Sequence, residues 1–160
     1  MSQNLIQNGT GRPMLEIENA QIIFCNFSGK KTEFNPLGKR SFHVVIEDPD
    51  LIERLQADGW NVRLRDKNPN FEPITTLEVN LRFDKFPPKI YQIVDGSRKP
   101  VQLDESNIGN LDYAKITNVD LTINPGYWEV NGKTGIKAWL NSMYVTIQED
   151  RFAQKYFSGD

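Results

Sequence analysis

A single residue separates Lys137 from Trp139 in residues 135–148, a segment that alternates polar and apolar side chains. Successive side chains of a β-strand point to opposite faces, so Ile136 and Ala138 share one face while Lys137 and Trp139 share the other. An indole ring beside an ammonium group on the non-core face has two explanations. A neighbouring element covers the ring, or the ring is a platform for a flat, negatively charged ligand such as a nucleotide.

Further aromatic or basic residues gather in three other places. They occupy the polar segment 27–40, the outward positions of a strand expected at 60–66, and the surroundings of an Asn131-Gly132 turn. Single-strand nucleic-acid binders combine these two residue types, because cations follow the phosphates and bases stack on aromatic faces. We predict the following DNA contacts: Phe27, Lys30, Lys31, Phe34, Lys39, Arg40, Arg63, Arg65, Tyr127, Trp128, Lys133, Lys137 and Trp139.

Groups that could carry catalysis are few. The chain has one histidine, His43, and one cysteine, Cys25, too few for a recognisable zinc site, and no glycine-rich phosphate loop. We interpret His43 as a structural or surface histidine rather than a catalytic one, Cys25 as a buried, inert thiol, and Asp48–Asp50 as a helix cap rather than a metal site. The sequence therefore predicts a protein without enzymatic activity, cofactor or metal.

Composition indicates one domain with an ordinary core. The chain has 160 residues, 38% of them hydrophobic, and a net charge of −2, which argues against binding polyanions by bulk charge but permits a local basic surface. No apolar run is long enough to span a membrane, and a single cysteine suits a reducing cytoplasm. We expect residues 1–14 to be a flexible leader and residues 15–160 to form one domain.

The alternation of residue types predicts a mainly β protein. Strands are expected at 15–26 with a bend near Asn19, and at 40–47, 60–66, 75–83, 89–94, 116–123 and 135–148, with a break at 124–126. A short helix should follow the second strand, from Asp48-Pro49 to Gly59, and a small one should lie at 149–157. Because strands and helices do not alternate, we favour a five-stranded OB-type antiparallel barrel with extra strands, and a β-sandwich second.

Residues 135–145, GIKAWLNSMYV, resemble the C-terminal core strand of tailed-phage single-stranded DNA-binding proteins, in which a glycine leads a strand with Leu and Val at fixed spacing. The basic loop, the helix after the second strand and the aromatic hairpin are similar as well. The resemblance implies an OB-fold that binds single-stranded DNA in phage replication and recombination, in the host cytoplasm, with Lys137 and Trp139 as contacts.

The last twelve residues depart from many single-strand binders, which end in a long acidic tail. EDRFAQKYFSGD holds only three acidic residues, so we expect its aromatic residues to pack on the barrel or to form an oligomer contact. Replication or recombination proteins remain possible partners. The alternative is a β-rich protein-interaction or virion-structural domain, in which the same aromatics form a protein interface.

Overall fold

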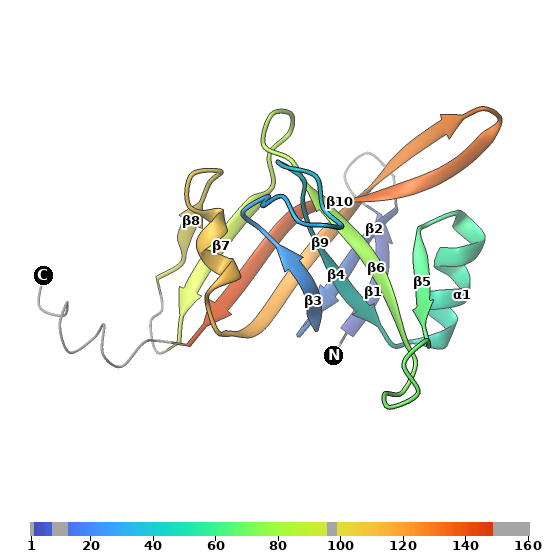
Figure 1. Ribbon diagram of the computed structural model, residues 1–160, viewed down its shortest axis with the longest axis horizontal. Helices are drawn as coiled ribbons and strands as arrows, with labels where there is room; N and C mark the ends of the chain where they lie inside the picture. The colour runs from blue at the N-terminus through green and yellow to red at the C-terminus, as the bar shows by residue number, and fades with distance from the viewer. Residues whose placement is uncertain (1, 8–12, 96–98, 149–160) are drawn as a thin grey trace, which may run out of the picture.

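The computed structural model describes residues 2–7, 13–95 and 99–148, and this part of the chain is mainly β (Figure 1). It contains one α-helix, α1 (Pro49–Asp58), and a 3-10 helix, η1 (Ile108–Asp112). The strands are β1 (Ser2–Gln7), β2 (Pro13–Glu18), β3 (Ile22–Asn26), β4 (Arg40–Ile46), β5 (Val62–Arg65), β6 (Ile74–Leu81), β7 (Lys89–Val94), β8 (Val101–Leu103), β9 (Ile116–Val130) and β10 (Lys133–Ile147). The expected mainly β character and the single helix after the second predicted strand are confirmed.

The strands form one curled, open sheet in the order β1-β2-β9-β10-β6-β4-β3. No ladder joins the end strands β1 and β3 within the described residues. β5 pairs with β6, β8 pairs with β7, and β10 runs parallel to both β6 and β7. β10 therefore pairs with three strands, β6, β7 and β9.

The bend expected near Asn19 separates β2 from β3. Asn19 has a φ of 51°, and the chain then changes partners, since β2 pairs with β9 whereas β3 pairs with β4. Around the bend, the Ala20 amide donates to the Val119 carbonyl and the Val45 amide donates to the Gln21 carbonyl. The bend therefore links β9 and β4, which are not neighbours in the strand order, through hydrogen bonds to one short segment.

β9 and β10 form a long hairpin arm that extends beyond the rest of the sheet (Figure 1). Asn131 and Gly132 have φ values of 51° and 78°, as a type I′ turn requires. The break predicted at residues 124–126 is wrong, because β9 continues through Pro125 opposite Ala138. β2 pairs with β9 only as far as Ile123, so the missing N–H of Pro125 interrupts no ladder.

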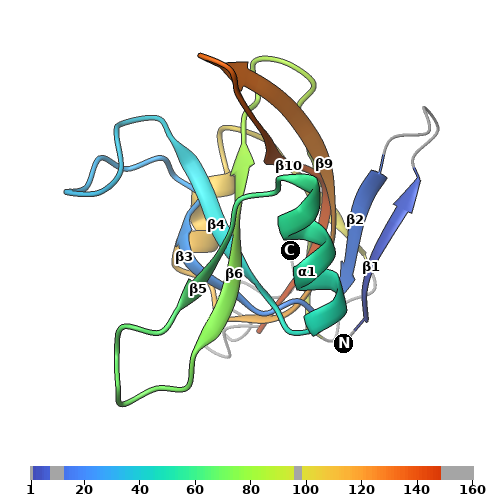
Figure 2. The same cartoon turned by 90° about the vertical axis from the view of Figure 1, so that its right-hand side faces the viewer.

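α1 supports the root of the arm (Figure 2). Asp48 caps its first turn by accepting a hydrogen bond from the Asp50 amide, and Gly59, with a φ of 99°, ends the helix. The Gly59 carbonyl then accepts a hydrogen bond from the Ile136 amide, and the buried Trp60 bridges to the same residue. The helix start and end predicted from the sequence are confirmed.

Three local expectations differ from the structure. Residues 2–7, expected to be a leader, form β1 against β2. Leu64, expected to point inward, is 59% exposed, because β5 is a short strand whose described ladder is with β6 alone. Cys25 is exposed because a bulge between Ile23 and Asn26 disrupts β3. The helix predicted at 149–157 lies outside the described residues.

The core fills the inner side of the curled sheet, closed at one end by α1 and Trp60. Its largest fully buried side chains are Phe27, Phe42, Leu15, Ile17, Ile46, Leu55, Leu77, Ile90, Ile108, Leu111, Ile123 and Met143.

Candidate nucleic-acid interface

The strand registers bring the polar side chains of four strands to one side of the sheet. His43 of β4 pairs with Glu78 of β6, and Asn80 of β6 pairs with Trp139 of β10, while Arg63 of β5 pairs with Thr76. Residues that alternate with core positions therefore share this side. We call it the basic face, made of Lys39, Ser41, His43, Arg63, Arg65, Thr76, Glu78, Asn80, Arg82, Lys137 and Trp139.

The basic face is positively charged although the whole chain has a net charge of −2. Its side chains include five cations and one carboxylate, that of Glu78. The cations are Lys39, Arg63, Arg65, Arg82 and Lys137. Binding responds to the local distribution of charge, so this side of the sheet attracts anions.

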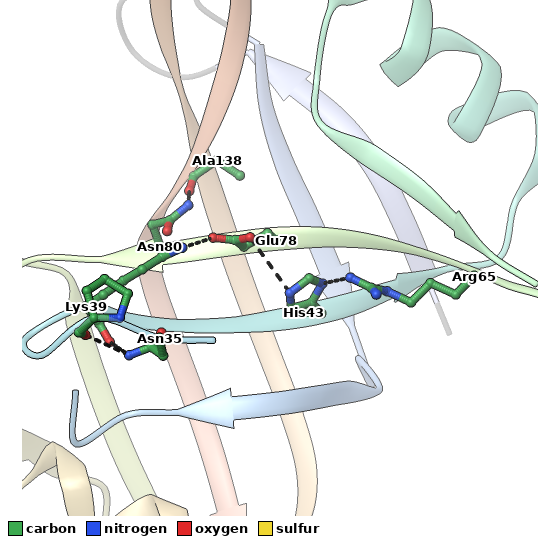
Figure 3. A network of polar contacts seen from close by, with 8 residues as sticks. Asn35, Lys39, His43, Arg65, Glu78, Asn80 and Ala138 are labelled. Carbon is green, nitrogen blue, oxygen red and sulfur yellow. Dashed lines mark hydrogen bonds and ion pairs between the residues drawn. The ribbon is translucent and has the colours of Figure 1, made fainter. Parts of the chain in front are cut away.

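A polar network runs across the centre of the basic face (Figure 3). Lys39 Nζ lies 2.8 Å from Glu78 Oε1, and Glu78 Oε2 lies 3.9 Å from His43 Nε2. On the other side of His43, Arg65 Nη2 lies 3.3 Å from His43 Nδ1, and Arg65 Nε donates to Thr76 Oγ1 at 3.1 Å. The network fixes two of the cations in place before any ligand arrives.

The same network perturbs the two titratable groups at its centre. Burial lowers the pKa of His43, and the positive charges of Arg65, Arg63 and Lys39 lower it further against the opposing effect of Glu78. Burial alone would raise the pKa of Glu78, but the hydrogen bond from Lys39 and the nearby cations outweigh it and hold that pKa below its usual value. At neutral pH, His43 is therefore neutral and Glu78 ionised.

Trp139 is partly buried against the arm and flanked by cations. Its ring covers Gly126 of β9, where a Cβ atom would come within 2.5 Å of the indole Nε1. The guanidinium carbon of Arg82 lies 4.4 Å from the ring centroid and Lys137 Nζ lies 4.7 Å from it. The arm therefore covers part of the ring, as the first explanation of Trp139 requires, and its role as a ligand platform stays a prediction.

Trp128 extends the basic face onto the arm. Its ring covers Gly135 on the neighbouring strand, and it lines a groove together with Glu78, Asn80 and Lys137. Tyr127 precedes it in β9 and therefore points to the other side of the arm, while Lys133 is exposed next to the turn.

The loop before β4 carries three exposed predicted contacts, Lys30, Lys31 and Phe34. The Asn35 side-chain amide donates to the carbonyls of Lys30, Pro36 and Lys39, which ties the loop together. Lys30 Nζ lies 4.5 Å from the Tyr113 ring centroid, beside η1. The loop adjoins the basic face through Lys39.

Two predicted contacts, Phe27 and Arg40, lie elsewhere. The ring of Phe27 is fully buried, with its centroid 5.6 Å from that of Phe42, because the segment after β3 turns into the core. Arg40 shares the inward side of β4 with Phe42, where its guanidinium donates to the Phe27 carbonyl and lies 3.8 Å from Glu105. Neither side chain is on the basic face, and we exclude both from the interface.

Residues 6–158 match the sequence profile of the phage ssDNA-binding domain family. The chain belongs to this family. No curated protein matches the sequence. Among solved structures, the single-stranded DNA-binding protein from bacteriophage Enc34 is similar over 99% of this chain and 97% of its own, with 12% identity and a TM-score of 0.54. The same phage protein in complex with ssDNA aligns over 94% and 98%, with 12% identity and a TM-score of 0.55.

Three residues of this phage ssDNA-binding domain that could contact DNA were missed in the sequence. Arg82 could have been found, since it continues the outward series Glu78, Asn80 in steps of two. Phe24 and Phe86 could not, because their exposure depends on φ values of 53° and 50° that residue types do not reveal. Phe24 lies under the Arg65 guanidinium, with its ring centroid 5.0 Å from the guanidinium carbon.

The remaining chemical candidates are isolated. No group of three or more His, Cys, Asp or Glu side chains that could hold a metal ion occurs within 2–7, 13–95 and 99–148. Cys25 is an exposed residue, but partial burial of its thiol and the nearby Asp112 carboxylate raise the pKa of the thiol to about 11. No helix in the described residues is long and apolar enough to span a membrane.

Proposed function

We propose that this phage ssDNA-binding domain holds single-stranded DNA along the basic face, with little dependence on sequence. The observation that carries the proposal is the shared side of the sheet, which carries five cations, two of them (Arg82 and Lys137) against the Trp139 ring. Cations that meet phosphates position a strand without reading its bases, and an aromatic ring stacks on any base.

The proposed contacts follow the face from the loop before β4 to the arm. Phosphates would meet the cations, and bases would stack on the rings, with Trp128 continuing the path along the arm. Tyr127 would take part only if the strand passes around the arm to its other side. The proposed contacts are Lys30, Lys31, Phe34, Lys39, Arg63, Arg65, Arg82, Tyr127, Trp128, Lys133, Lys137 and Trp139.

We further propose that residues 15–160 are a single OB-type domain. In this arrangement β2 and β3 are two halves of one bent strand, and β4, β6, β9 and β10 supply the other four strands of a five-stranded barrel. β5, β7 and β8 are additions, and β1 precedes the domain and pairs with β2. Two hydrogen bonds directly after the Asn19 bend support it, because Ala20 bonds to Val119 of β9 and Gln21 bonds to Val45 of β4. In OB-folds, such a barrel presents one face and two flanking loops to oligonucleotides.

The biological role proposed is protection or organisation of single-stranded DNA during phage replication and recombination, in the host cytoplasm and without catalysis. Family membership supports it. The raised pKa of the Cys25 thiol keeps it protonated, and His43 contacts Arg65 and Glu78. Neither residue therefore has the partner that a catalytic nucleophile and its base require. Within this role, the proposed partners besides single-stranded DNA are replication or recombination proteins and further copies of the same chain.

A matched pair of double variants tests the location of the binding surface. Arg63→Gln with Lys137→Gln removes two basic-face cations, whereas Arg54→Gln with Lys115→Gln removes two exposed cations from α1 and the start of β9. The slope of log affinity against log salt for oligo-dT should flatten by about 1.4 in the first variant, since each single-strand phosphate contact contributes about 0.7. Equal slopes for both variants would contradict a binding surface on the basic face.

The same titration addresses the alternative of a protein-interaction surface. A mostly apolar protein interface responds little to salt, whereas phosphate binding weakens steeply. The five cations of the basic face favour DNA.

A further inference from the structure

A second groove opens beside Trp139, where the chain leaves β6. It has a volume of about 690 Å³ and is lined by Arg82, Lys85 and Phe86 of the β6–β7 loop and by Asn124 and Trp139 of the arm. This volume is within the range of roughly 300–1,000 Å³ found for small-ligand sites. Apart from Trp139, none of these side chains was among the contacts predicted from the sequence.

Two aromatic rings line this groove. The Trp139 ring packs closely over Gly126, where a side chain would displace it, and forms one surface of the groove. Phe86 is 86% exposed, and its φ of 50° is uncommon for an aromatic residue. Strained backbone of this kind persists where the surrounding structure requires it, often at ligand sites.

The polar lining of the groove suits a phosphate and a base edge. Lys85 is exposed, the Arg82 guanidinium lies over the Trp139 ring, and the lining residues include no Asp or Glu. Arginine can both stack on a ring and pair with a phosphate. Two side-chain amides also line the groove, and they are joined by a hydrogen bond from Asn124 Nδ2 to Asn141 Oδ1.

We propose that this groove is a subsite for one nucleotide of the bound strand. The base lies against Trp139 and Phe86, and its phosphate pairs with Arg82 and Lys85. The Arg82 guanidinium covers the face of the Trp139 ring in the free protein, and it moves to the phosphate when the base stacks on that face. This inference rests on the proposed function, because it extends the same DNA path past the end of β6.

The test compares Phe86→Ala with Phe71→Ala, which removes an exposed phenylalanine from the loop at the opposite end of β6. Fluorescence anisotropy would measure the affinity of each variant for an oligo-dT and for an oligomer of the same length that lacks its bases. Phe86→Ala should lose about fivefold or more on oligo-dT, as expected when one stacked base is lost, and much less on the abasic oligomer. Phe71→Ala should bind both as the wild type does.

Several outcomes would overturn the subsite. One is equal behaviour of the two variants, and another is a loss for Phe86→Ala that is the same on both oligomers. In either case, wild-type binding to oligo-dT with a steep salt response would leave the proposed function intact. A wild type that fails to bind oligo-dT would instead overturn the proposed function, and the subsite with it.

A second measurement concerns the phosphate. Arg82→Gln with Lys85→Gln should flatten the salt slope by up to about 1.4 relative to the Arg54→Gln and Lys115→Gln control. An unchanged slope would overturn the assignment of the phosphate to these two residues.

Discussion

Replacement of Trp139 by leucine separates its two roles, because leucine keeps an apolar side chain over Gly126 and removes the stacking ring. The indole is partly buried, so we expect the change to lose about 40–80 Å² of buried apolar surface, or about 1–2 kcal/mol of the free energy of unfolding at ~25 cal/mol/Å². The domain should therefore remain folded, with a melting temperature lower by about 2–8 °C.

The loss of DNA affinity in Trp139→Leu should be larger than a packing defect would produce. One base stacked on an aromatic ring contributes about 1–3 kcal/mol, which corresponds to about a five- to 150-fold weaker affinity for oligo-dT. Arg82 and Lys137 remain in place, so the salt slope should stay close to that of the wild type.

Anisotropy titration with labelled oligo-dT, below the melting temperature of the variant, measures this effect, with Phe71→Leu as the matched control. Trp139→Phe should recover part of the affinity, since a smaller ring still stacks. Wild-type affinity in Trp139→Leu together with a collapse in melting temperature would show that Trp139 only packs, and would refute its role as a stacking surface.

Three further predictions concern other parts of the site. Gly126→Ala should weaken oligo-dT binding without removing any contact residue, because its Cβ displaces the Trp139 indole; unchanged affinity and unchanged tryptophan emission would contradict this. Lys30→Ala, Lys31→Ala and Lys39→Ala combined should flatten the salt slope by up to about two units for oligo-dT and oligo-dA alike, and a slope equal to that of the wild type would place the loop away from the DNA. The pKa of His43 is lowered from its ordinary 6.5, so the unfolded chain binds this proton more readily than the folded protein does. The free energy of unfolding of the wild type should therefore fall as the pH drops below 6.5. Urea titrations should show a shallower fall for His43→Gln, and identical pH profiles of the two proteins would disprove the pKa shift.

Much of the fold was predictable because it depends on local chemistry. The Asp48-Pro49 start and Gly59 end of α1, the Asn131-Gly132 turn and the bend at Asn19 are all set by residues that favour one backbone conformation. The break predicted at 124–126 failed for a tertiary reason. Proline ends a strand only where its missing N–H would face a partner, and at Pro125 the neighbouring β2 has already ended.

The basic face was predictable in part. Alternation correctly placed Arg63, Arg65, Lys137 and Trp139 outward, because a two-residue period is a property of the strand itself. It could not show that Phe27 turns into the core, since the direction of a loop depends on what it packs against. The stacking of Arg82, which directly follows β6, on Trp139 of β10 joins residues that are far apart in the sequence, and only the parallel pairing of β6 with β10 brings them together.

The most direct test of DNA binding on the basic face is a titration of the wild-type protein with poly-dT, followed by tryptophan fluorescence at two salt concentrations. Binding should quench the fluorescence, because Trp128 and Trp139 lie on the proposed DNA path. The slope of log affinity against log salt should approach about −3.5 if all five cations of the face meet phosphates, so the affinity should fall roughly a hundredfold between about 50 and about 200 mM salt. Binding that does not depend on salt, or no quenching at either salt concentration, would contradict the account.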